Sequence, residues 1–149
     1  MKALPRGKNR KMIIFCKTKT TATNIYKYLD RKYGEESVRV VHGNKDQNTR
    51  INAIKLFKEE KIRFLVATDV AARGIDIEDV SHVFNFEVPL VYEDYIHRIG
   101  RTGRAQKIGD SITFCAPNDE YHLKKIQKLI GDKIPVAQIP VEVEILPTP

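Results

Sequence analysis

The sequence predicts an α/β fold of three layers, in which helices cover both faces of a mostly parallel central sheet. Short apolar runs alternate with stretches that carry apolar residues at helical spacing. The first run, Met12–Cys16, is apolar throughout, which is typical of a strand buried on both faces of a parallel sheet. At 149 residues, with 42% hydrophobic and 30% charged residues, the chain fits one folded domain with a substantial core.

The first half of the chain contains three predicted strands and two helices. After the first strand, a threonine-rich turn leads into a helix that extends to about Tyr33. Residues 38–41 form the second strand, and the second helix extends from near Gln47 to Lys58. Residues 62–67 form the third strand, because all of them except Arg63 are apolar.

The second half continues the same alternation. Thr68 and Asp69 cap a short helical turn, which Gly74 closes. Two more strands are predicted at residues 82–86 and 111–115, with a helix from about Val91 to Ile99 between them, and the last helix covers residues 118–130. Such alternation implies right-handed crossovers and therefore a mostly parallel sheet.

The two ends of the chain differ from the predicted domain, which covers residues 11–133. Residues 1–10 are polar and basic without periodicity, and they are predicted to be a linker or a frayed end. Residues 134–149 are predicted to be an extended tail, because prolines alternate there with apolar residues. The prolines are Pro135, Pro140, Pro147 and Pro149. The sequence assigns this tail no role.

The composition points to an anionic partner and a reducing compartment. The net charge of +7, from 26 basic and 19 acidic residues, favours a partner such as nucleic acid. Cys16 and Cys115 each sit in a predicted strand and lack metal-ligand spacing, so we expect two buried free thiols, no metal site and a cytoplasmic address. There is no apolar stretch of roughly 18 residues and no signal-peptide pattern, so we expect no membrane insertion.

Several polar residues follow the ends of the predicted strands. In parallel α/β sheets, ligands bind beyond the carboxyl ends of the strands, and Thr18, Gly43, Thr68 and Asp69 all fall there. At Thr18, the strand, turn and helix start also form an arrangement that can bind an anion through free backbone N–H groups. A simple helix cap by a threonine explains the same pattern equally well.

The basic segment His97 to Arg104 carries the clearest chemical signal. Arg98, Arg101 and Arg104 lie within seven residues, and Gly100 and Gly103 allow the backbone to turn tightly and approach a ligand closely. These guanidinium groups suit a phosphate. The alternative is a solvated basic helix end, but such an end would not need two glycines at fixed positions.

This segment, HRIGRTGR, resembles the last signature motif (motif VI) of the DEAD-box RNA helicases. Three further segments resemble motifs of that family in the right order. Residues 13–18 are similar to motif IV, Gln47 with Arg50 to the QxxR element, and residues 68–76 to motif V. The resemblance covers roughly residues 11–131 and implies the second RecA-like domain of a helicase core, a RecA-like three-layer α/β/α sandwich.

The resemblance implies a role in RNA binding for six residues. The residues implied to contact the RNA sugar-phosphate backbone are Thr18, Gly43, Gln47, Arg50 and Thr68, with Asp69 shaping the loop. Contacts of this kind do not read the bases, so they would tolerate any RNA sequence.

It also implies a role in ATP hydrolysis for five residues. Gly74 and Asp76 would meet the ATP ribose, and Arg101 and Arg104 would be arginine fingers that stabilise charge on the γ-phosphoryl group. His97 would couple the nucleotide site to the neighbouring domain. Arg73, in motif V, is placed only loosely at the domain interface.

The sequence lacks the G-x-x-x-x-G-K-[ST] loop that cradles nucleotide phosphates. We therefore expect ATP with Mg²⁺ to be held mainly by an N-terminal RecA-like domain of the same protein, and the isolated chain to be a monomer without ATPase activity. Asp119 to His122 spells DExH, the metal-holding box of another helicase group. Its context, after Pro117 and Asn118, is that of an ordinary helix start.

Two alternatives remain beside an ATP-dependent RNA helicase. One is a stand-alone RNA-binding or adaptor domain that has lost turnover, although such a module has no use for Arg101 and Arg104 at finger spacing. The other is a DNA-directed superfamily 2 helicase, whose final motif usually opens with glutamine where this chain has His97. Residues 42–45 and 134–140 also resemble the bacterial RhlE-type branch faintly.

Overall fold

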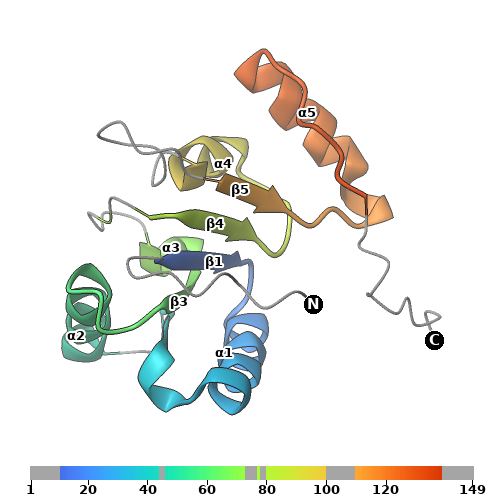
Figure 1. Ribbon diagram of the computed structural model, residues 1–149. Helices are drawn as coiled ribbons and strands as arrows, with labels where there is room; N and C mark the ends of the chain where they lie inside the picture. The colour runs from blue at the N-terminus through green and yellow to red at the C-terminus, as the bar shows by residue number, and fades with distance from the viewer. Residues whose placement is uncertain (1–10, 44–45, 73–76, 78–79, 100–109, 139–149) are drawn as a thin grey trace.

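A five-stranded, all-parallel sheet forms the centre of the molecule (Figure 1). The computed structural model describes residues 11–43, 46–72, 77, 80–99 and 110–138. The strands are β1 (Met12–Cys16), β2 (Val38–Val41), β3 (Phe64–Thr68), β4 (His82–Asn85) and β5 (Asp110–Thr113). They lie in the order β2-β3-β1-β4-β5. The predicted parallel α/β architecture is confirmed, because every pair of neighbouring strands is parallel.

In the described ranges, five α-helices connect or follow the strands. They are α1 (Lys19–Tyr33), α2 (Gln47–Lys58), α3 (Asp69–Ala72), α4 (Tyr92–Ile99) and α5 (Glu120–Ile130), with short 3₁₀ turns η1 (Glu35–Ser37) and η2 (Pro117–Asp119). The helix α5 lies at the β5 end of the molecule, away from α1 and α2 (Figure 1). No helix in the described ranges is both long enough and apolar enough to cross a membrane.

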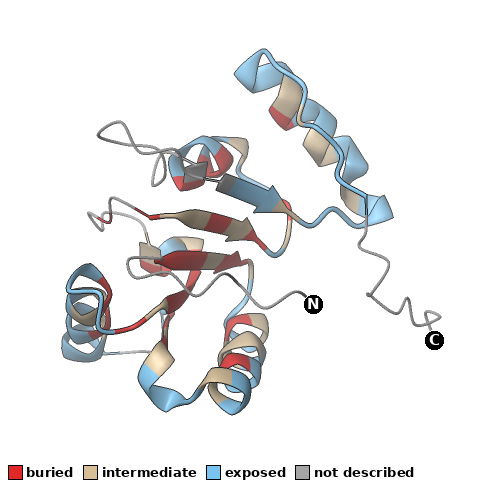
Figure 2. Cartoon of the chain, viewed as in Figure 1, coloured by how far each residue is buried: buried red, intermediate tan, exposed pale blue. Residues whose placement is uncertain are grey.

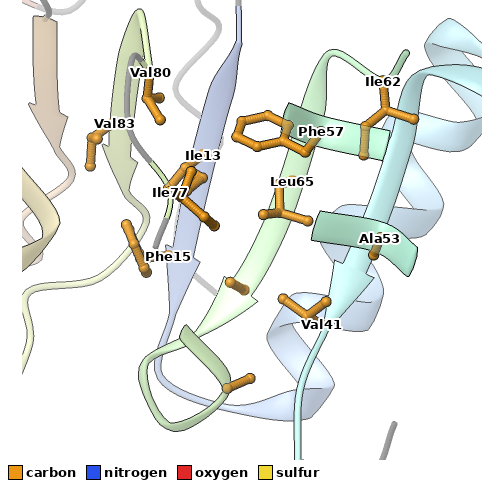
Figure 3. Close-up of a cluster of buried hydrophobic side chains, with 12 residues drawn as sticks. Ile13, Phe15, Val41, Ala53, Phe57, Ile62, Leu65, Ile77, Val80 and Val83 are labelled. Atoms are coloured by element: carbon orange, nitrogen blue, oxygen red, sulfur yellow. The ribbon is translucent and has the colours of Figure 1, made fainter. Parts of the chain in front are cut away.

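The sheet is buried on both faces by alternating side chains. On one face, Ile13, Leu65 and Val83 pack with residues of α2 and α3 (Figure 3). On the other face, Met12 and Val66 pack with residues of α1. The alternation follows from the strand period of two, which sends successive side chains to opposite faces. The central strands β1 and β3 are consequently buried along their length (Figure 2).

Three predicted boundaries were wrong by about two residues, within the usual uncertainty of such boundaries. The strand β3 begins at Phe64, not at residue 62. The strand β5 ends at Thr113, so Cys115 lies beyond it and is exposed, contrary to the buried thiol that we predicted. The helix α5 begins at Glu120, not at Asn118, because the N–H group of Asp119 bonds the carbonyl of Ala116 at 2.8 Å and closes a 3₁₀ turn first.

Candidate functional site

The carboxyl ends of β1, β2 and β3 lie side by side, as predicted. The register pairs Cys16 with Thr68 and Val41 with Ala67, so these strands end at the same level. Neighbouring strands are about 4.8 Å apart. Thr18, Gly43 and the Thr68–Asp69 step are therefore brought to one edge of the sheet, which we call the carboxyl edge.

Thr18 forms the N-cap of α1. Its hydroxyl oxygen accepts a hydrogen bond from the N–H group of Thr21 at 3.1 Å, and its carbonyl accepts one from Ala22 at 3.1 Å. Of the two alternatives at this position, the helix cap is confirmed. The side chain of Thr18 is also exposed, so the cap leaves it accessible from the carboxyl edge.

Gly43 is exposed at the turn after β2. Its φ lies outside the left-handed region that favours glycine, and a Cβ atom added to it would meet only the Cε atom of Lys19, at 3.9 Å. That is an ordinary van der Waals distance. The fold therefore does not require glycine at this position. A ligand that approaches the backbone closely would require it, because any larger side chain would be in the way.

Arg50 connects α2 to α3. Its Nη2 atom donates to the carbonyl of Ala71 at 2.9 Å, and its Nη1 atom donates to the side chain of Gln47 at 3.4 Å. Gln47 is exposed in the first turn of α2, whose N-cap is Asp46. The predicted pair Gln47 and Arg50 thus lies at the start of α2, and Arg50 links it to the segment after β3.

Among the residues that the structure describes, Arg98 is the most buried charged residue. The sequence predicted for it a ligand-binding role like that of its neighbours. Its side chain is only 2% exposed and forms a two-pronged ion pair with Asp69, with Nε donating to Oδ1 at 2.8 Å. Its Nη1 atom donates to the Oδ1 atom of Asn85 at 2.9 Å. The guanidinium group also lies over the ring of Phe15, 4.9 Å from its centroid. That prediction was wrong for Arg98, because these contacts occupy its donors inside the protein.

The contacts of Arg98 continue into a polar network below the carboxyl edge. The buried Asn85 donates from Nδ2 to the hydroxyl of Thr113 at 3.0 Å. Burial raises the pKa of Tyr95, and a hydrogen bond with Thr113 opposes this. Burial also raises the pKa of Cys16 to about 12, and the charge of Glu87 adds to this effect. The network joins α3, α4, β4 and β5.

The remaining predicted site residues lie on α4, at the end of β3 or outside the described residues. His97 is exposed on α4. Gly74, Asp76, Arg101 and Arg104, together with Arg73, lie outside the described residues. Thr68 is 5% exposed at the end of β3, so its side chain is nearly covered.

The DExH string forms no metal-ligand group. His122 faces Tyr92, with its Nδ1 atom 2.9 Å from the hydroxyl oxygen, and Asp119 lies 3.8 Å from the ammonium group of Lys17. Within the described ranges, no three of the side chains that can bind metals come together. His122 therefore helps to attach α5 to α4, and Asp119 connects η2 to Lys17, the residue after β1.

Comparisons with known proteins identify the family. The sequence profile of the family described as "Helicase conserved C-terminal domain" matches residues 1–106. The DEAD-box ATP-dependent RNA helicase RhpA of Helicobacter pylori is 44% identical over 140 residues, which are 94% of this chain and 28% of that protein. The chain thus spans less than a third of the length of this relative.

Solved structures agree with this family. Mss116p DEAD-box helicase domain 2, solved bound to an RNA duplex, matches with a TM-score of 0.78 and 32% identity, over 91% of this chain and 54% of that one. The C-terminal domain of the DEAD-box protein Dbp5 matches with a TM-score of 0.75 and 37% identity, over 82% and 71% of the two chains. The chain therefore belongs to the DEAD-box RNA helicases and contains their C-terminal, RecA-like helicase domain.

Proposed function

We propose that this chain supplies one half of an ATP-dependent RNA helicase and binds the RNA sugar-phosphate backbone along its carboxyl edge. The residues proposed to contact RNA are Thr18, Gly43, Gln47, Arg50 and Thr68, with Asp69 holding the turn. The observation that carries this proposal is their placement at the ends of three neighbouring strands and at the start of α2. Further support comes from Mss116p domain 2, which was solved bound to an RNA duplex.

We further propose that residues 74–76 and the segment from His97 to Arg104 act on ATP. Gly74 and Asp76 contact the ribose, and Arg101 and Arg104 stabilise charge on the γ-phosphoryl group of ATP with Mg²⁺, which an N-terminal RecA-like domain mainly holds. His97 couples this site to that domain. The support is the family, together with the pair between Asp69 and Arg98, which joins the start of motif V to the first arginine of motif VI. Through this pair, a shift at the carboxyl edge would also move the segment that carries Arg101 and Arg104.

The whole protein would then separate short RNA duplexes locally, with RNA and the N-terminal domain as its partners. The chain alone is proposed to be a monomer. A cytoplasmic address fits Cys16 and Cys115, which are both free thiols. Membership of the RhlE-type branch stays a prediction, because the similar proteins include RhpA and RhlB helicases.

RNA binding by the chain tests the proposal directly. Fluorescence anisotropy with a labelled single-stranded RNA, measured over a series of salt concentrations, gives both the affinity and its salt dependence. Changing Gln47→Ala and Arg50→Ala together should weaken binding and reduce the slope of log K against log salt by about one, because one phosphate contact is lost. Lys58→Ala, at the far end of α2, removes the same charge and should have a smaller effect.

Unchanged affinity and slope in the double variant would contradict the proposed interface. Arg50 also bonds the carbonyl of Ala71, so Gln47→Ala alone should be measured beside it as a variant that leaves this bond intact. Gly43→Ala adds a further check. The fold accommodates its Cβ, so a loss of affinity with unchanged thermal stability would indicate close approach of RNA to this backbone.

A further inference from the structure

The turn at residues 17–18 connects β1 to α1, and a side chain ties it to the segment after β4. The N–H group of Lys17 donates to the Oε1 atom of Glu87 at 3.1 Å. The strands β1 and β4 are neighbours in the sheet (Figure 1), and the N–H group of Phe86 donates to the carbonyl of Phe15 at 3.0 Å. The bond from Lys17 follows this one toward the carboxyl edge, and a side chain takes the place of a backbone carbonyl there.

The backbone of Glu87 is anchored on both sides. The residue before it, Phe86, is bonded to β1. The carbonyl of Glu87 accepts a hydrogen bond from the Nη1 atom of Arg98 at 3.3 Å, and the next two residues, Val88 and Pro89, are buried. The carboxylate of Glu87 is therefore presented to the turn from a backbone that the sheet and α4 hold in place.

Glu87 contacts the backbone of Lys17, whose charge is directed elsewhere. The ammonium group of Lys17 lies 3.8 Å from the carboxylate of Asp119 in η2. Burial raises the pKa of Cys16 to about 12, and the charge of Glu87 raises it further, which agrees with a carboxylate close to the end of β1. A hydrogen bond from a backbone N–H group to a carboxylate is stronger than one to a neutral acceptor.

On grounds of charge alone, a carboxylate in this position is unfavourable for RNA binding. Thr18, one residue after Lys17, is exposed at the carboxyl edge and is proposed to contact the sugar-phosphate backbone. A negative charge close to that contact repels phosphate. Any benefit of Glu87 to RNA binding must therefore come from its hydrogen bond, because a partly buried N–H group without a partner is costly.

The bond acts on the residue that makes two other contacts. Thr18 caps α1 by accepting from the N–H group of Thr21 at 3.1 Å, and it is also proposed to meet RNA. We propose that Glu87 is a positioning residue for RNA binding, whose carboxylate holds the turn at residues 17–18 through the N–H group of Lys17. This inference rests on the RNA contact proposed above for Thr18.

Substitutions at Glu87 separate this role from an effect of charge. Glu87→Ala removes both the charge and the acceptor, whereas Glu87→Gln removes the same charge and keeps an oxygen that can accept from Lys17. In the anisotropy assay with single-stranded RNA, Glu87→Ala should weaken binding about fivefold, because the bond that orients the contact is lost. Glu87→Gln should bind within about twofold of the unsubstituted chain.

Two further variants complete the series. Glu87→Met fills nearly the same space as glutamine without an acceptor, so it should behave as Glu87→Ala does, and it replaces that variant if thermal unfolding shows that the alanine chain is not folded. Glu36→Ala removes an exposed carboxylate at the opposite edge of the sheet. As the control, it should change the affinity by less than about twofold.

The effect should pass through Thr18 and should be visible without RNA. In a chain that carries Thr18→Ala, Glu87→Ala should cause no further loss of affinity, because two substitutions that remove one contact are not additive. Amide hydrogen exchange, followed by NMR on the RNA-free chain, reports the bond itself. The Lys17 amide should exchange at least about tenfold faster in Glu87→Ala and Glu87→Met than in the unsubstituted chain and Glu87→Gln.

Three results would overturn the proposal. Stronger binding, or an equal loss, in Glu87→Gln and Glu87→Met would show that the acceptor is not what matters. Equal exchange at Lys17 in all variants would show that this amide does not depend on Glu87. Faster exchange with unchanged affinity would leave the bond a purely structural role.

Gln47→Ala keeps a failure of this proposal distinct from a failure of the RNA interface. If Gln47→Ala weakens RNA binding and Glu87→Met does not, the interface stands and the positioning role of Glu87 is wrong. If neither substitution changes the affinity, the proposed interface is wrong, and the role of Glu87 fails with it.

Discussion

Among single residues, Arg98 differs most from what its sequence context suggests. It belongs to a run of arginines, yet its guanidinium group is buried against Asp69, Asn85 and Phe15. In α4, Arg98 shares one helix face with Asp94 and Tyr95, and all three residues are buried. A charge on such a face indicates a buried partner. The partner could not be named from the sequence, because Asp69 lies 29 residues away.

We predict that Arg98→Ala lowers the free energy of unfolding by about 3–5 kcal/mol, since it leaves the carboxylate of Asp69 without its buried partner. Arg98→Lys should recover only part of the loss, because one ammonium group cannot reach both Asp69 and Asn85 in the same way. Urea denaturation measures both. His97→Ala, exposed on the same helix, is the control and should change stability by less than about 0.5 kcal/mol. A fully stable Arg98→Ala variant would show that the ion pair contributes nothing.

The two cysteines should differ in reactivity. Alkylation requires the thiolate, and with the pKa of Cys16 at about 12 only about one thiol in 10⁴ is ionised at pH 8. We therefore expect iodoacetamide to modify the exposed Cys115 in the folded protein and Cys16 only after unfolding, as mass spectrometry would detect.

Cys115 itself should react more slowly than an ordinary exposed thiol. Burial raises its pKa first, and the carboxylates of Asp119 and Glu120 raise it further, so less thiolate forms at a given pH. Added salt screens these carboxylates, lowers the pKa and should accelerate alkylation. Asp119→Asn should have the same effect at low salt. A rate independent of salt would argue against the contribution of these charges.

At the scale of helices and strands, the ends of the helices show where prediction succeeds and where it fails. Gly131 ends α5 with a left-handed φ of 74°, as a glycine at that position suggests. Glu60 follows α2 with a φ of 60°, although it is not glycine. There the N–H group of Lys61 bonds the carbonyl of Leu56 at 2.9 Å, and that of Glu60 bonds Phe57 at 3.2 Å. This pattern is a Schellman motif. The sequence does not predict it, because the left-handed residue is a glutamate and not the usual glycine or asparagine.

Glu60→Gly should stabilise the domain by about 0.5–1 kcal/mol, because glycine adopts the left-handed conformation without a steric cost. Thermal or urea unfolding measures the gain. Glu59→Gly, one residue earlier with a φ of −79°, is the matched control and should not stabilise. If the two variants behave alike, backbone strain at Glu60 is not the cause.

The order and type of every strand and α-helix were predicted, because apolar periodicity reports burial directly. Boundaries at β3, β5 and α5 were less certain, since they depend on hydrogen bonds such as that from Asp119 to Ala116. Of the candidate site, the sequence located Thr18, Gly43, Thr68 and Asp69 at the carboxyl edge. It could not predict the pairing of Asp69 or the link from Arg50 to Ala71, because both join distant segments.

At the scale of the whole molecule, the parallel topology gathers the residues proposed to bind RNA at one edge of the sheet. We predict that the isolated chain hydrolyses no ATP above background, because it lacks a phosphate-binding loop. In the two-domain protein, Arg104→Ala should reduce RNA-stimulated turnover by roughly 10³, while nucleotide binding largely survives. A coupled phosphate-release assay and a labelled-nucleotide titration measure these quantities. Lys58→Ala is the control, and unchanged turnover in Arg104→Ala would remove the finger role.

The uniform strand direction also separates the carboxyl edge, where we propose that RNA binds, from the opposite edge of the sheet. The 3₁₀ turn η1, with the exposed Glu35 and Glu36, enters β2 at the end opposite Gly43. Four residues of strand, about 13 Å, separate the two. A dye or a surface tether attached at Glu36 would therefore stay clear of bound RNA, which makes this turn a suitable handle for single-molecule measurements of domain closure.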